Sequence, residues 1–552
     1  MNSVADWLAD DPDPDTVAQL RALIAAGDTE EIHDAFAGLL QFGTAGLRGR
    51  LGPGPNRMNL AVVRRAAAGL AAYLGSGRVV IGYDARRKSD LFARDSARVL
   101  AGAGLQPLLL PGPLPTPVLA FAVRQLHCVA GVMVTASHNP AQDNGYKVYL
   151  GGGSQIAPPA DGQIAARIAA VASVSDLPLS DAYEVLDGSV VDRYVAAVAG
   201  LAEPGPRALT LVTTSLHGVG GATLERALVA AGFAAPIAVA SQREPDPDFP
   251  TVAFPNPEEP GALEAALTLG RQRAADAIIA NDPDADRCAV AIAEGADFAM
   301  LTGDELGALL GWWIIERDRR TERRNRGTFA NSIVSSRLLG RIAAAAGTPH
   351  VETLTGFKWI ARVPGLRYGY EEAIGYCVAP WIVADKDGIG AAVLVAELLA
   401  SLKAEGRTAR DVLDDLARQH GLHATSQWSV RVADLATIRV AMDSLRAQPP
   451  LALAGSDVAQ STDLALGAAG LPATDGLRYL MTNGSRVIVR PSGTEPKLKC
   501  YLEVIEAVEG DDVRTATARA QQRLAVLQQD IAAATGLSQA FAGSTEELRE
   551  SR

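Results

Sequence analysis

Short apolar runs alternate with stretches of helical spacing along most of this chain. Apolar runs lie at 79–83, 107–110 and 129–134, with helical patterns at 91–102 and 117–126 between them. Short buried strands separated by helices are typical of βαβ units and a mostly parallel sheet. The sequence therefore predicts an α/β domain here, preceded by a helical N-terminal extension.

The same alternation returns twice before residue 420. A second set of predicted strands covers 209–213, 237–240 and 277–280, and a third set covers 328–334 and 350–354, with helical stretches between them. We expect three α/β domains in series with similar topology, although no repeat is visible as sequence identity.

After residue 420 the pattern changes to strands followed by a long helix. Strands are expected at 426–432, 486–489 and 499–504, and a polar helix at 512–534. This order indicates a fourth domain of the α+β class, after three similar α/β domains with mixed or parallel sheets. The expected domain boundaries are 1–200, 201–301, 302–420 and 421–552.

Composition narrows the class of protein. A chain of 552 residues exceeds what one hydrophobic core usually serves, and a net charge of −12 disfavours non-specific binding to nucleic acid. The four cysteines form no C-x-x-C pair, which argues against a zinc cluster or a disulfide framework. The acidic N-terminus lacks a signal-peptide pattern and the apolar run 306–315 is too short to span a bilayer, so we expect a cytoplasmic protein.

A polar segment follows the third predicted strand directly. This serine segment, Thr-Ala-Ser-His-Asn-Pro at 135–140, places Ser137 beyond the carboxyl end of the strand, where ligands bind in open α/β sheets. Asp-Asn-Gly-Tyr-Lys follows at 143–147. Taken alone, the pattern fits either a hydroxyl that takes part in chemistry or an ordinary polar βα loop with a turn.

Three aspartates alternate directly after another predicted strand. In this aspartate loop, Asp282, Asp284 and Asp286 can converge on one hard cation through oxygen ligands, and the adjacent Arg287 suits a shared anion such as phosphate. An EF-hand does not fit, because its sixth and twelfth positions would be Arg287 and Ala293. The remaining alternative is a solvated acidic turn, against which the apolar strands on both sides count.

Two further loops carry weaker signals. The segment 490–497, Arg-Pro-Ser-Gly-Thr-Glu-Pro-Lys, combines an arginine fork, hydroxyls and a glycine that frees backbone N–H groups, so it suits a phosphate cradle or else a tight hairpin. It is not a Walker A loop. The sugar loop at 370–376 offers Glu371 for sugar hydroxyls, and Lys358 in the preceding segment suits a phosphate, although a loop glutamate is usually just solvated.

These segments fall one in each expected domain, and together they resemble the motifs of the α-D-phosphohexomutase family. Residues 135–140 resemble the family's active-serine motif, 282–287 its D-x-D-x-D-R metal loop, 490–497 its phosphate loop and 42–49 its N-terminal F-G-T-x-G-x-R-G segment. The resemblance covers nearly the whole chain. It implies four domains around a central cleft and an isomerase of the phosphoglucomutase/phosphomannomutase class that binds a phosphosugar.

The resemblance also implies roles for residues at matching positions. Ser137 would carry the phosphoryl group in the resting enzyme, and Lys147 would be the general acid/base, with a pKa lowered by burial or neighbouring cations. The other catalytic positions would be His138, Arg48 and Arg287. Mg²⁺ would be held by phosphorylated Ser137, Asp282, Asp284 and Asp286. The substrate would be bound by Lys358, Glu371, Ala373, Arg490, Ser492, Gly493 and Thr494.

Some positions depart from the family's motifs. Pro283 replaces a glycine and removes an N–H from the aspartate loop, but leaves its carboxylates. In the sugar loop Ala373 stands where hexose-specific members have serine, Ile374 is additional, and Tyr376 replaces histidine. The loop is more similar to the branch that includes phosphoglucomutases and phosphopentomutases, so the sugar is left open between glucose, mannose and a pentose.

The implied reaction has two half-reactions joined by a bisphosphosugar, which also serves as activator. Phosphorylated Ser137 gives its phosphoryl group to a hydroxyl of the sugar phosphate, and the serine then takes the other phosphate back. Alternatives are a phosphopentomutase, a serine-dependent phosphatase and a non-catalytic sugar-phosphate-binding protein. We expect no nucleic-acid or membrane partner, and both a monomer and a homodimer fit the sequence.

Overall fold

The computed structural model describes residues 3–43, 46–321, 327–432, 434–467, 470–492, 497–510 and 512–537. The chain forms two compact units. The first contains residues 1–306 and 357–406, and the second contains residues 307–356 and 407–552.

The first sheet of the first unit has six strands in the order β1-β5-β4-β2-β3-β6. They are β1 (Leu47–Arg50), β2 (Arg78–Tyr83), β3 (Gln106–Pro113), β4 (Ala130–Val134), β5 (Asp143–Leu150) and β6 (Glu184–Val185). β2, β3, β4 and β6 are parallel, whereas β5 runs antiparallel to β4 and β1. The sheet is therefore mixed, and β5 begins at the segment 143–147, where the sequence predicted no strand.

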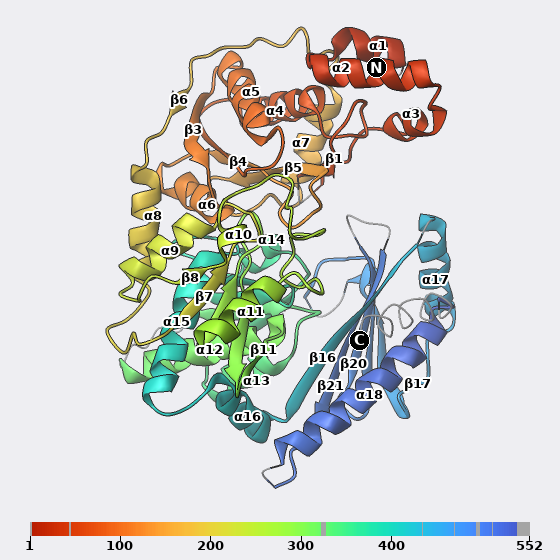
Figure 1. Ribbon diagram of the computed structural model, residues 1–552. Coiled ribbons are helices and arrows are strands. Elements are labelled where there is room, and N and C mark those ends of the chain that lie inside the picture. The colour runs from red at the N-terminus through yellow and green to blue at the C-terminus, as the bar shows by residue number, and fades with distance from the viewer. Residues whose placement is uncertain are drawn as a thin grey trace. The chain divides into compact units, whose positions relative to one another are not determined.

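Side chains of a strand point alternately to the two faces of a sheet. Since the side chains on both faces of this sheet are apolar, helices cover both. Val79 and Ile81 of β2 share a core with α4 and α5, whereas Gly82 and Gly131 face α6 on the other side (Figure 1). The helices of this region are α4 (Leu60–Leu74), α5 (Ser89–Gly102), α6 (Thr116–Gln125), α7 (Ala160–Ala169) and α8 (Ser189–Ala199).

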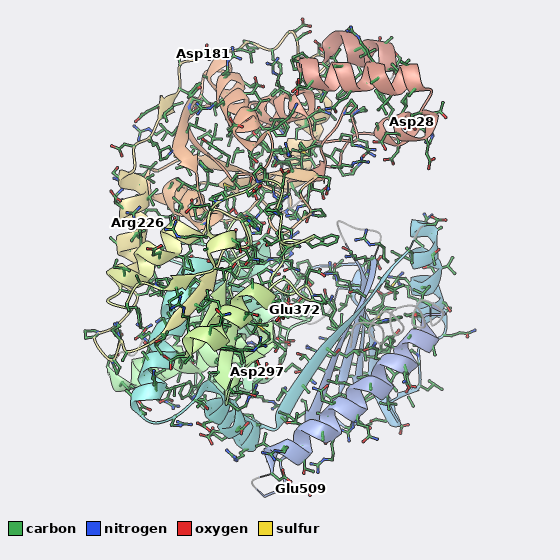
Figure 2. All side chains as sticks on the ribbon, viewed as in Figure 1. Asp28, Asp181, Arg226, Asp297, Glu372 and Glu509 are labelled. Atoms are coloured by element: carbon green, nitrogen blue, oxygen red, sulfur yellow. The ribbon has the colours of Figure 1, made fainter. Side chains whose placement is uncertain are left out.

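The predicted N-terminal extension is confirmed as the helices α1 (Val4–Asp10), α2 (Pro14–Ala26) and α3 (Thr29–Ala35). Trp7 of α1 enters the same core as α4. Asp28, which Figure 2 labels, caps α3 by accepting a hydrogen bond from the Glu31 N–H (3.1 Å). Lys88 Nζ lies 2.7 Å from Asp13 Oδ2, so an ion pair ties the extension to the loop after β2.

The second sheet of the first unit has five strands in the order β11-β10-β9-β7-β8. They are β7 (Leu211–Thr214), β8 (Ile237–Ala238), β9 (Ala277–Ala280), β10 (Ala289–Glu294) and β11 (Asp297–Met300). β7, β8 and β9 are parallel, and β10 is antiparallel to β9 and β11. The accompanying helices are α9 (Gly221–Ala230), α10 (Ala240–Arg243) and α11 (Glu264–Arg273).

The first unit also includes part of the third predicted domain. Here β14 (Leu366–Glu371) and β15 (Gly375–Cys377) pair antiparallel, between α14 (Phe357–Ile360) and α15 (Gly388–Ala404). α15 is buried along almost its whole length, which explains why its sequence is apolar on every side. α12 (Gly303–Arg320) begins in this unit, and neither it nor any other helix in the described ranges is long and apolar enough to cross a membrane.

The second unit contains a six-stranded sheet in the order β16-β21-β20-β19-β18-β17, with every neighbouring pair antiparallel. The strands are β16 (Leu422–Arg431), β17 (Ala452–Leu453), β18 (Ser456–Asp463), β19 (Leu477–Met481), β20 (Arg486–Pro491) and β21 (Lys497–Glu506). The long helix α18 (Val513–Ala534) lies along one face, with Leu524 and Ile531 in the shared core (Figure 1). The expected α+β character of this region is confirmed.

The rest of the second unit is a smaller α/β part. β12 (Thr328–Ser332) and β13 (His350–Thr353) pair in parallel. The second unit also contains most of α12, from residue 307 on, together with α13 (Leu338–Ala345), α16 (Ala409–His420) and α17 (Leu435–Ala447), and a short 3₁₀ turn covers Leu464–Leu466.

A buried carboxylate on β21 joins the two parts of the second unit. Glu503, which is 1% exposed, accepts a hydrogen bond from Arg337 Nε (2.6 Å) and lies 3.1 Å from Arg486 Nη2 and 3.0 Å from His423 Nδ1. Burial alone would raise the pKa of Glu503, but Arg486 and its other partners hold it below its ordinary value.

We expect Glu503→Gln to lower the free energy of unfolding by about 3 kcal/mol at pH 7, because the buried guanidinium of Arg486 and the half-buried one of Arg337 lose their shared counter-charge. Asp443→Asn, which removes an exposed pair with Arg446, should change it by less than about 0.5 kcal/mol. The contribution of Glu503 is full above the ordinary pKa of 4.5 and is lost as the pH falls below it. Chemical denaturation between pH 3.5 and 7 measures this, and equal losses in the two variants would contradict it.

Candidate active site

The predicted serine segment lies directly after β4. Ser137 has a φ of 54°, in the left-handed region that residues other than glycine rarely adopt. Its Oγ donates a hydrogen bond to Asp282 Oδ2 (2.7 Å) and lies 3.3 Å from His138 Nδ1. Ser137 is 2% exposed. The hydroxyl therefore points from the first sheet at the aspartate loop of the second.

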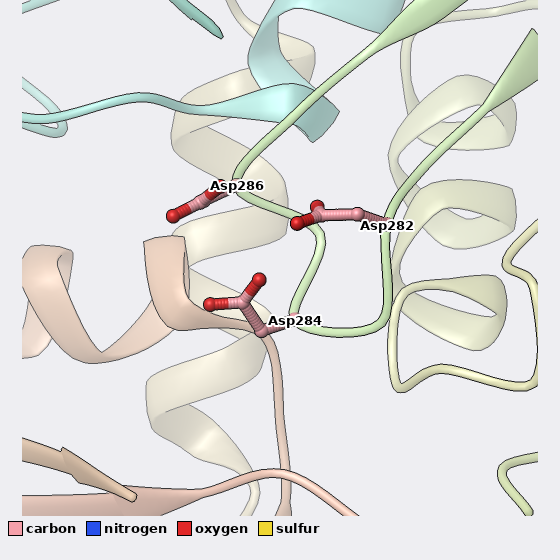
Figure 3. A group of neighbouring side chains, drawn as sticks. All are labelled: Asp282, Asp284 and Asp286. Atoms are coloured by element: carbon pink, nitrogen blue, oxygen red, sulfur yellow. The ribbon is translucent and has the colours of Figure 1, made fainter. Parts of the chain in front are cut away.

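The aspartate loop connects β9 to β10 and gathers its carboxylates on one side. Asp282, Asp284 and Asp286 are buried, and one oxygen of each lies within 4.8 Å of the others (Figure 3). Among the described residues, no hydrogen-bond donor contacts Oδ1 of Asp284 or Oδ1 of Asp286. Buried carboxylate oxygens without a donor are costly unless a cation engages them, so this donor set fits a hard divalent cation such as Mg²⁺.

The electrostatics of the three aspartates are uneven. Burial raises the pKa of Asp282 well above its ordinary value, and the neighbouring charges of Asp284 and Asp286 raise it further. Burial would also raise the pKa of Asp286, but Lys147 and Lys386 lower it below its ordinary value. A bound cation would reduce the repulsion between the negative charges of Asp282, Asp284 and Asp286.

Backbone contacts fix the shape of the aspartate loop. Asn281 Nδ2 donates to Arg287 O (2.7 Å) and closes its base, while the carbonyl of Pro283 accepts from the Val219 N–H (2.8 Å). The proline that replaces the family's glycine therefore leaves the carboxylates in place. α15 begins at Gly388, where a Cβ would lie 2.1 Å from Arg287 O, so a glycine is required for its first turn to approach this loop.

Lys147 reaches the aspartate loop from β5. Its Nζ lies 2.7 Å from Asp284 Oδ2 and 2.9 Å from Asp286 Oδ2. Burial alone would lower the pKa of Lys147, but the two carboxylates raise it above its ordinary value. The expectation of a lowered pKa was therefore wrong, because it considered burial and neighbouring cations without these two contacts.

Arg287, Arg48 and His138 lie around the same hydroxyl. Arg287 Nε is 3.9 Å from Asp282 Oδ2, and Arg48 Nη1 of β1 donates to Asn139 Oδ1 (3.2 Å) in the serine segment. Burial, and then the charges of Arg287 and Arg48, lower the pKa of His138 well below its ordinary value. Its imidazole is therefore neutral near pH 7.

Lys386 is a basic residue at this site that the sequence interpretation missed. It lies between β15 and α15, is 9% exposed, and its Nζ is 3.4 Å from Asp286 Oδ2. Burial would lower the pKa of Lys386, but Asp286 and Asp385 raise it above its ordinary value. The signal in the sequence that could have revealed Lys386 is its position between two aspartates, directly before a long apolar run.

The sugar loop is attached to the aspartate loop. The Cys288 N–H donates to Ile374 O (3.0 Å), and Arg287 and Gly375 form an isolated antiparallel bridge. The additional residue Ile374 has a φ of 50° and supplies this carbonyl, so the insertion serves to join the two loops.

Residues of the sugar loop differ in what they offer to a ligand. Glu371 and Ala373 are half-buried, and Glu371 is close enough to Arg287 to interact with it electrostatically. Tyr376 is fully buried and its hydroxyl donates to Gly303 O (3.2 Å). Tyr376 therefore belongs to the core and does not take the place of the histidine in hexose-specific members.

The residues expected to bind phosphate lie in both units. Lys358 belongs to α14 in the first unit. Arg490 on β20 and Ser492 directly after it belong to the second unit, and both are half-buried. Gly493 and Thr494 lie outside the described residues. In the first unit, the structure brings together Arg48, Ser137, His138, Lys147, Asp282, Asp284, Asp286 and Arg287.

Four family models match successive parts of the chain. The alpha/beta/alpha domains I, II and III of phosphoglucomutase/phosphomannomutase match residues 39–175, 192–295 and 302–420, and the C-terminal domain matches 430–520. The chain therefore belongs to the phosphoglucomutase/phosphomannomutase family. It is an isomerase of the phosphohexomutase type with the family's four-domain α/β fold, as the sequence predicted.

Individual relatives agree with this family. A Haemophilus influenzae protein named "Probable phosphomannomutase" is 47% identical over 456 residues, which cover 81% of this chain and 93% of the relative. Human phosphopentomutase is 34% identical, covering 91% of this chain and 90% of the relative. The solved structure of a phosphoglucomutase/phosphomannomutase family protein from Burkholderia thailandensis has a TM-score of 0.68 at 20% identity, covering 89% of this chain and 97% of that chain, and shows the same fold.

Proposed function

We propose that the protein interconverts the 1-phosphate and 6-phosphate of glucose, mannose or both, through phosphorylated Ser137 and a bisphosphosugar intermediate. The observation that carries this proposal is the 2.7 Å hydrogen bond from Ser137 Oγ to Asp282, one of three buried carboxylates that share a small volume. Phosphoryl transfer depends on positioning and on neutralising the charge of the transferred group, and a serine hydroxyl facing a cation site supplies both.

Mg²⁺ is proposed to bind Asp282, Asp284 and Asp286 together with an oxygen of phosphorylated Ser137. When bound, it would act as a Lewis acid on the phosphoryl oxygens. Besides the charge of the cation, the side chains of Arg287 and Arg48 supply positive charge and orient the phosphoryl group. The three buried aspartates with two donor-free oxygens support this assignment.

Proton transfer is assigned to two residues with different charge states. His138 is neutral, and its Nδ1 lies 3.3 Å from Ser137 Oγ, so we assign it the role of proton acceptor. Lys147 is protonated and takes the role of proton donor. In the first half-reaction the bond from Ser137 Oγ to phosphorus breaks and Oγ takes a proton from Lys147, while the sugar hydroxyl oxygen bonds to phosphorus and gives its proton to His138. The second half-reaction runs these steps in reverse on the other phosphate.

Substrate recognition is proposed for the loops of the last two domains. Glu371 would accept hydrogen bonds from sugar hydroxyls, and Ala373 beside it leaves room for the ring. Arg490, Ser492, Gly493 and Thr494 would bind the distal phosphate of the substrate, and Lys358 is assigned a phosphate contact of its own. We propose domain boundaries at 1–200, 201–301, 302–420 and 421–552, which the extents of the family models support, with the second model beginning inside α8.

A phosphopentomutase is the second candidate. It is favoured by the 34% identity to human phosphopentomutase and by the burial of Tyr376, which leaves the sugar loop with fewer polar groups for a hexose. The same phosphoryl-transfer residues would serve both sugars, so substrate comparison separates the two candidates.

The test is an isomerase assay with Mg²⁺ and a trace of the matching bisphosphosugar. Glucose 1-phosphate, mannose 1-phosphate and ribose 1-phosphate are compared side by side while free phosphate is monitored. We expect isomerisation without phosphate release, and a kcat/KM at least about tenfold higher for a hexose than for ribose 1-phosphate. A preference for ribose 1-phosphate would establish the pentomutase instead, and phosphate release without isomerisation would establish a phosphatase.

A further inference from the structure

The loop after β2 contacts the serine segment through residues that have no part in the proposed chemistry. Arg86 lies in this loop and is 3% exposed. Its guanidinium donates to backbone carbonyls from both terminal nitrogens: Nη2 to Ser137 O (2.6 Å) and Asn139 O (2.5 Å), and Nη1 to Pro140 O (2.7 Å) and Asp143 O (3.2 Å). One guanidinium fork therefore spans the backbone that presents the serine hydroxyl.

Asp84, two residues earlier in the same loop, holds the other side of Ser137. The Ser137 N–H donates to Thr135 Oγ1 (2.9 Å), and Thr135 Oγ1 donates in turn to Asp84 Oδ2 (2.6 Å). Asp84 Oδ2 also lies 3.3 Å from Arg86 Nε. The loop after β2 therefore binds the carbonyl of Ser137 directly, through Arg86, and its N–H indirectly, through Thr135 and Asp84.

Phe249 covers the face of the same guanidinium. The Cζ of Arg86 lies 4.9 Å from the centre of the Phe249 ring, and Phe249 is 3% exposed. Phe249 lies between α10 and α11, the helices of the second sheet, so the fork is held between two layers of the first unit. A ring on this face excludes water and fixes the plane in which the four N–H···O bonds can form.

These contacts explain how Ser137 keeps a backbone conformation that serine ordinarily avoids. A φ of 54° is unfavourable for a side chain with a Cβ, and it persists only where the surroundings over-determine it. Without the fork on its carbonyl, the residue would relax to a negative φ. Such a rotation would turn Oγ away from Asp282.

We propose that Arg86, supported by Asp84 and Phe249, is a positioning residue that holds Ser137 in its left-handed conformation and so aims Oγ at Asp282. This inference rests on the proposed function of Ser137. Arg86 acts through the backbone and binds no sugar, so it governs kcat and the rate at which Ser137 accepts a phosphoryl group. It leaves the KM for the sugar phosphate nearly unchanged.

The test compares Arg86→Lys with Arg64→Lys. A lysine keeps the charge but cannot span four carbonyls. Arg64 is a matched control because it is also buried in the first unit and makes two hydrogen bonds to Asp95 (2.7 and 2.9 Å), away from the serine segment. We expect Arg86→Lys to lower kcat at least 30-fold with KM within twofold, and Arg64→Lys to keep kcat within threefold even where its thermal stability falls equally.

Hydrogen exchange of the backbone amides at 135–146 gives a readout that does not depend on activity. We expect at least tenfold faster exchange there in Arg86→Lys than in Arg64→Lys, and an intermediate increase in Phe249→Leu. If the unaltered protein lacks isomerase activity, the proposed function fails while exchange still tests Arg86. Exchange and kcat that match the Arg64→Lys control would overturn the positioning role alone.

Discussion

Replacing Ser137 by alanine is expected to lower kcat/KM for isomerisation by about 10⁵-fold or more, the order of loss that follows removal of a covalent nucleophile. The expected effect is large because, in the proposed mechanism, the hydroxyl that faces Asp282 is the group that carries the phosphoryl. The nearby Thr135 does not replace it, since its Oγ1 donates to Asp84. Isomerisation is measured with a coupled assay, and intact-mass measurement after incubation with the bisphosphosugar reports the added phosphoryl group.

Ser96→Ala provides the matched control for this experiment. Ser96 is a fully buried serine of α5, and its hydroxyl donates to Phe92 O (2.7 Å) within that helix. We expect this variant to keep kcat/KM within threefold and to accept one phosphoryl group. A Ser137→Ala protein that retained more than a thousandth of the activity, or that still gained a phosphoryl group, would sink the phosphoserine mechanism.

Changing any one of Asp282, Asp284 or Asp286 to asparagine is expected to lower kcat by about 10³-fold and to raise at least tenfold the Mg²⁺ concentration that gives half-maximal activity. Asparagine has nearly the same shape as aspartate, so the loop geometry is retained while one negative charge is lost. Titration with Mn²⁺ followed by electron paramagnetic resonance measures cation binding without turnover.

Asp297→Asn is the control for these variants. Asp297, which Figure 2 labels, lies on β11 of the second sheet and is an exposed residue that pairs with Arg271 (2.9 Å). We expect its Mg²⁺ dependence and Mn²⁺ binding to match those of the unaltered protein. If the variants of Asp282, Asp284 and Asp286 bound Mn²⁺ as tightly as this control, the cation would not use these carboxylates.

The serine segment and the aspartate loop were predictable because each follows an apolar strand, where parallel sheets place their ligands. β5 was not predicted, because the polar residues at its start are equally typical of a loop with a turn. Asn144 is buried in the structure and donates to Arg87 O (3.0 Å) and Ser89 Oγ (2.9 Å). Because no strand was predicted at this position, the two carboxylate contacts of Lys147 could not be foreseen.

Arg86, Lys386 and Glu503 were missed for a related reason. Their partners are distant in sequence, and an arginine that binds four carbonyls carries no spacing pattern that distinguishes it from a surface arginine. Local periodicity reports whether a side chain belongs to a strand or a helix. It does not report which backbone oxygens the fold brings to a charged group.

Two residues that contact the serine segment or its support, Phe249 and Asp282, lie far C-terminal to Ser137 and are therefore synthesised after it. A nascent chain that ends before Phe249 and Asp282 contains Ser137 but lacks the ring that covers Arg86 and the carboxylate that receives the hydroxyl. At bacterial or eukaryotic rates, the roughly 145 residues between Ser137 and Asp282 take on the order of 7 to 30 s to synthesise. In the proposed mechanism, a chain released before Asp282 therefore lacks groups on which phosphoryl transfer depends, and we expect it to be inert towards phosphosugars.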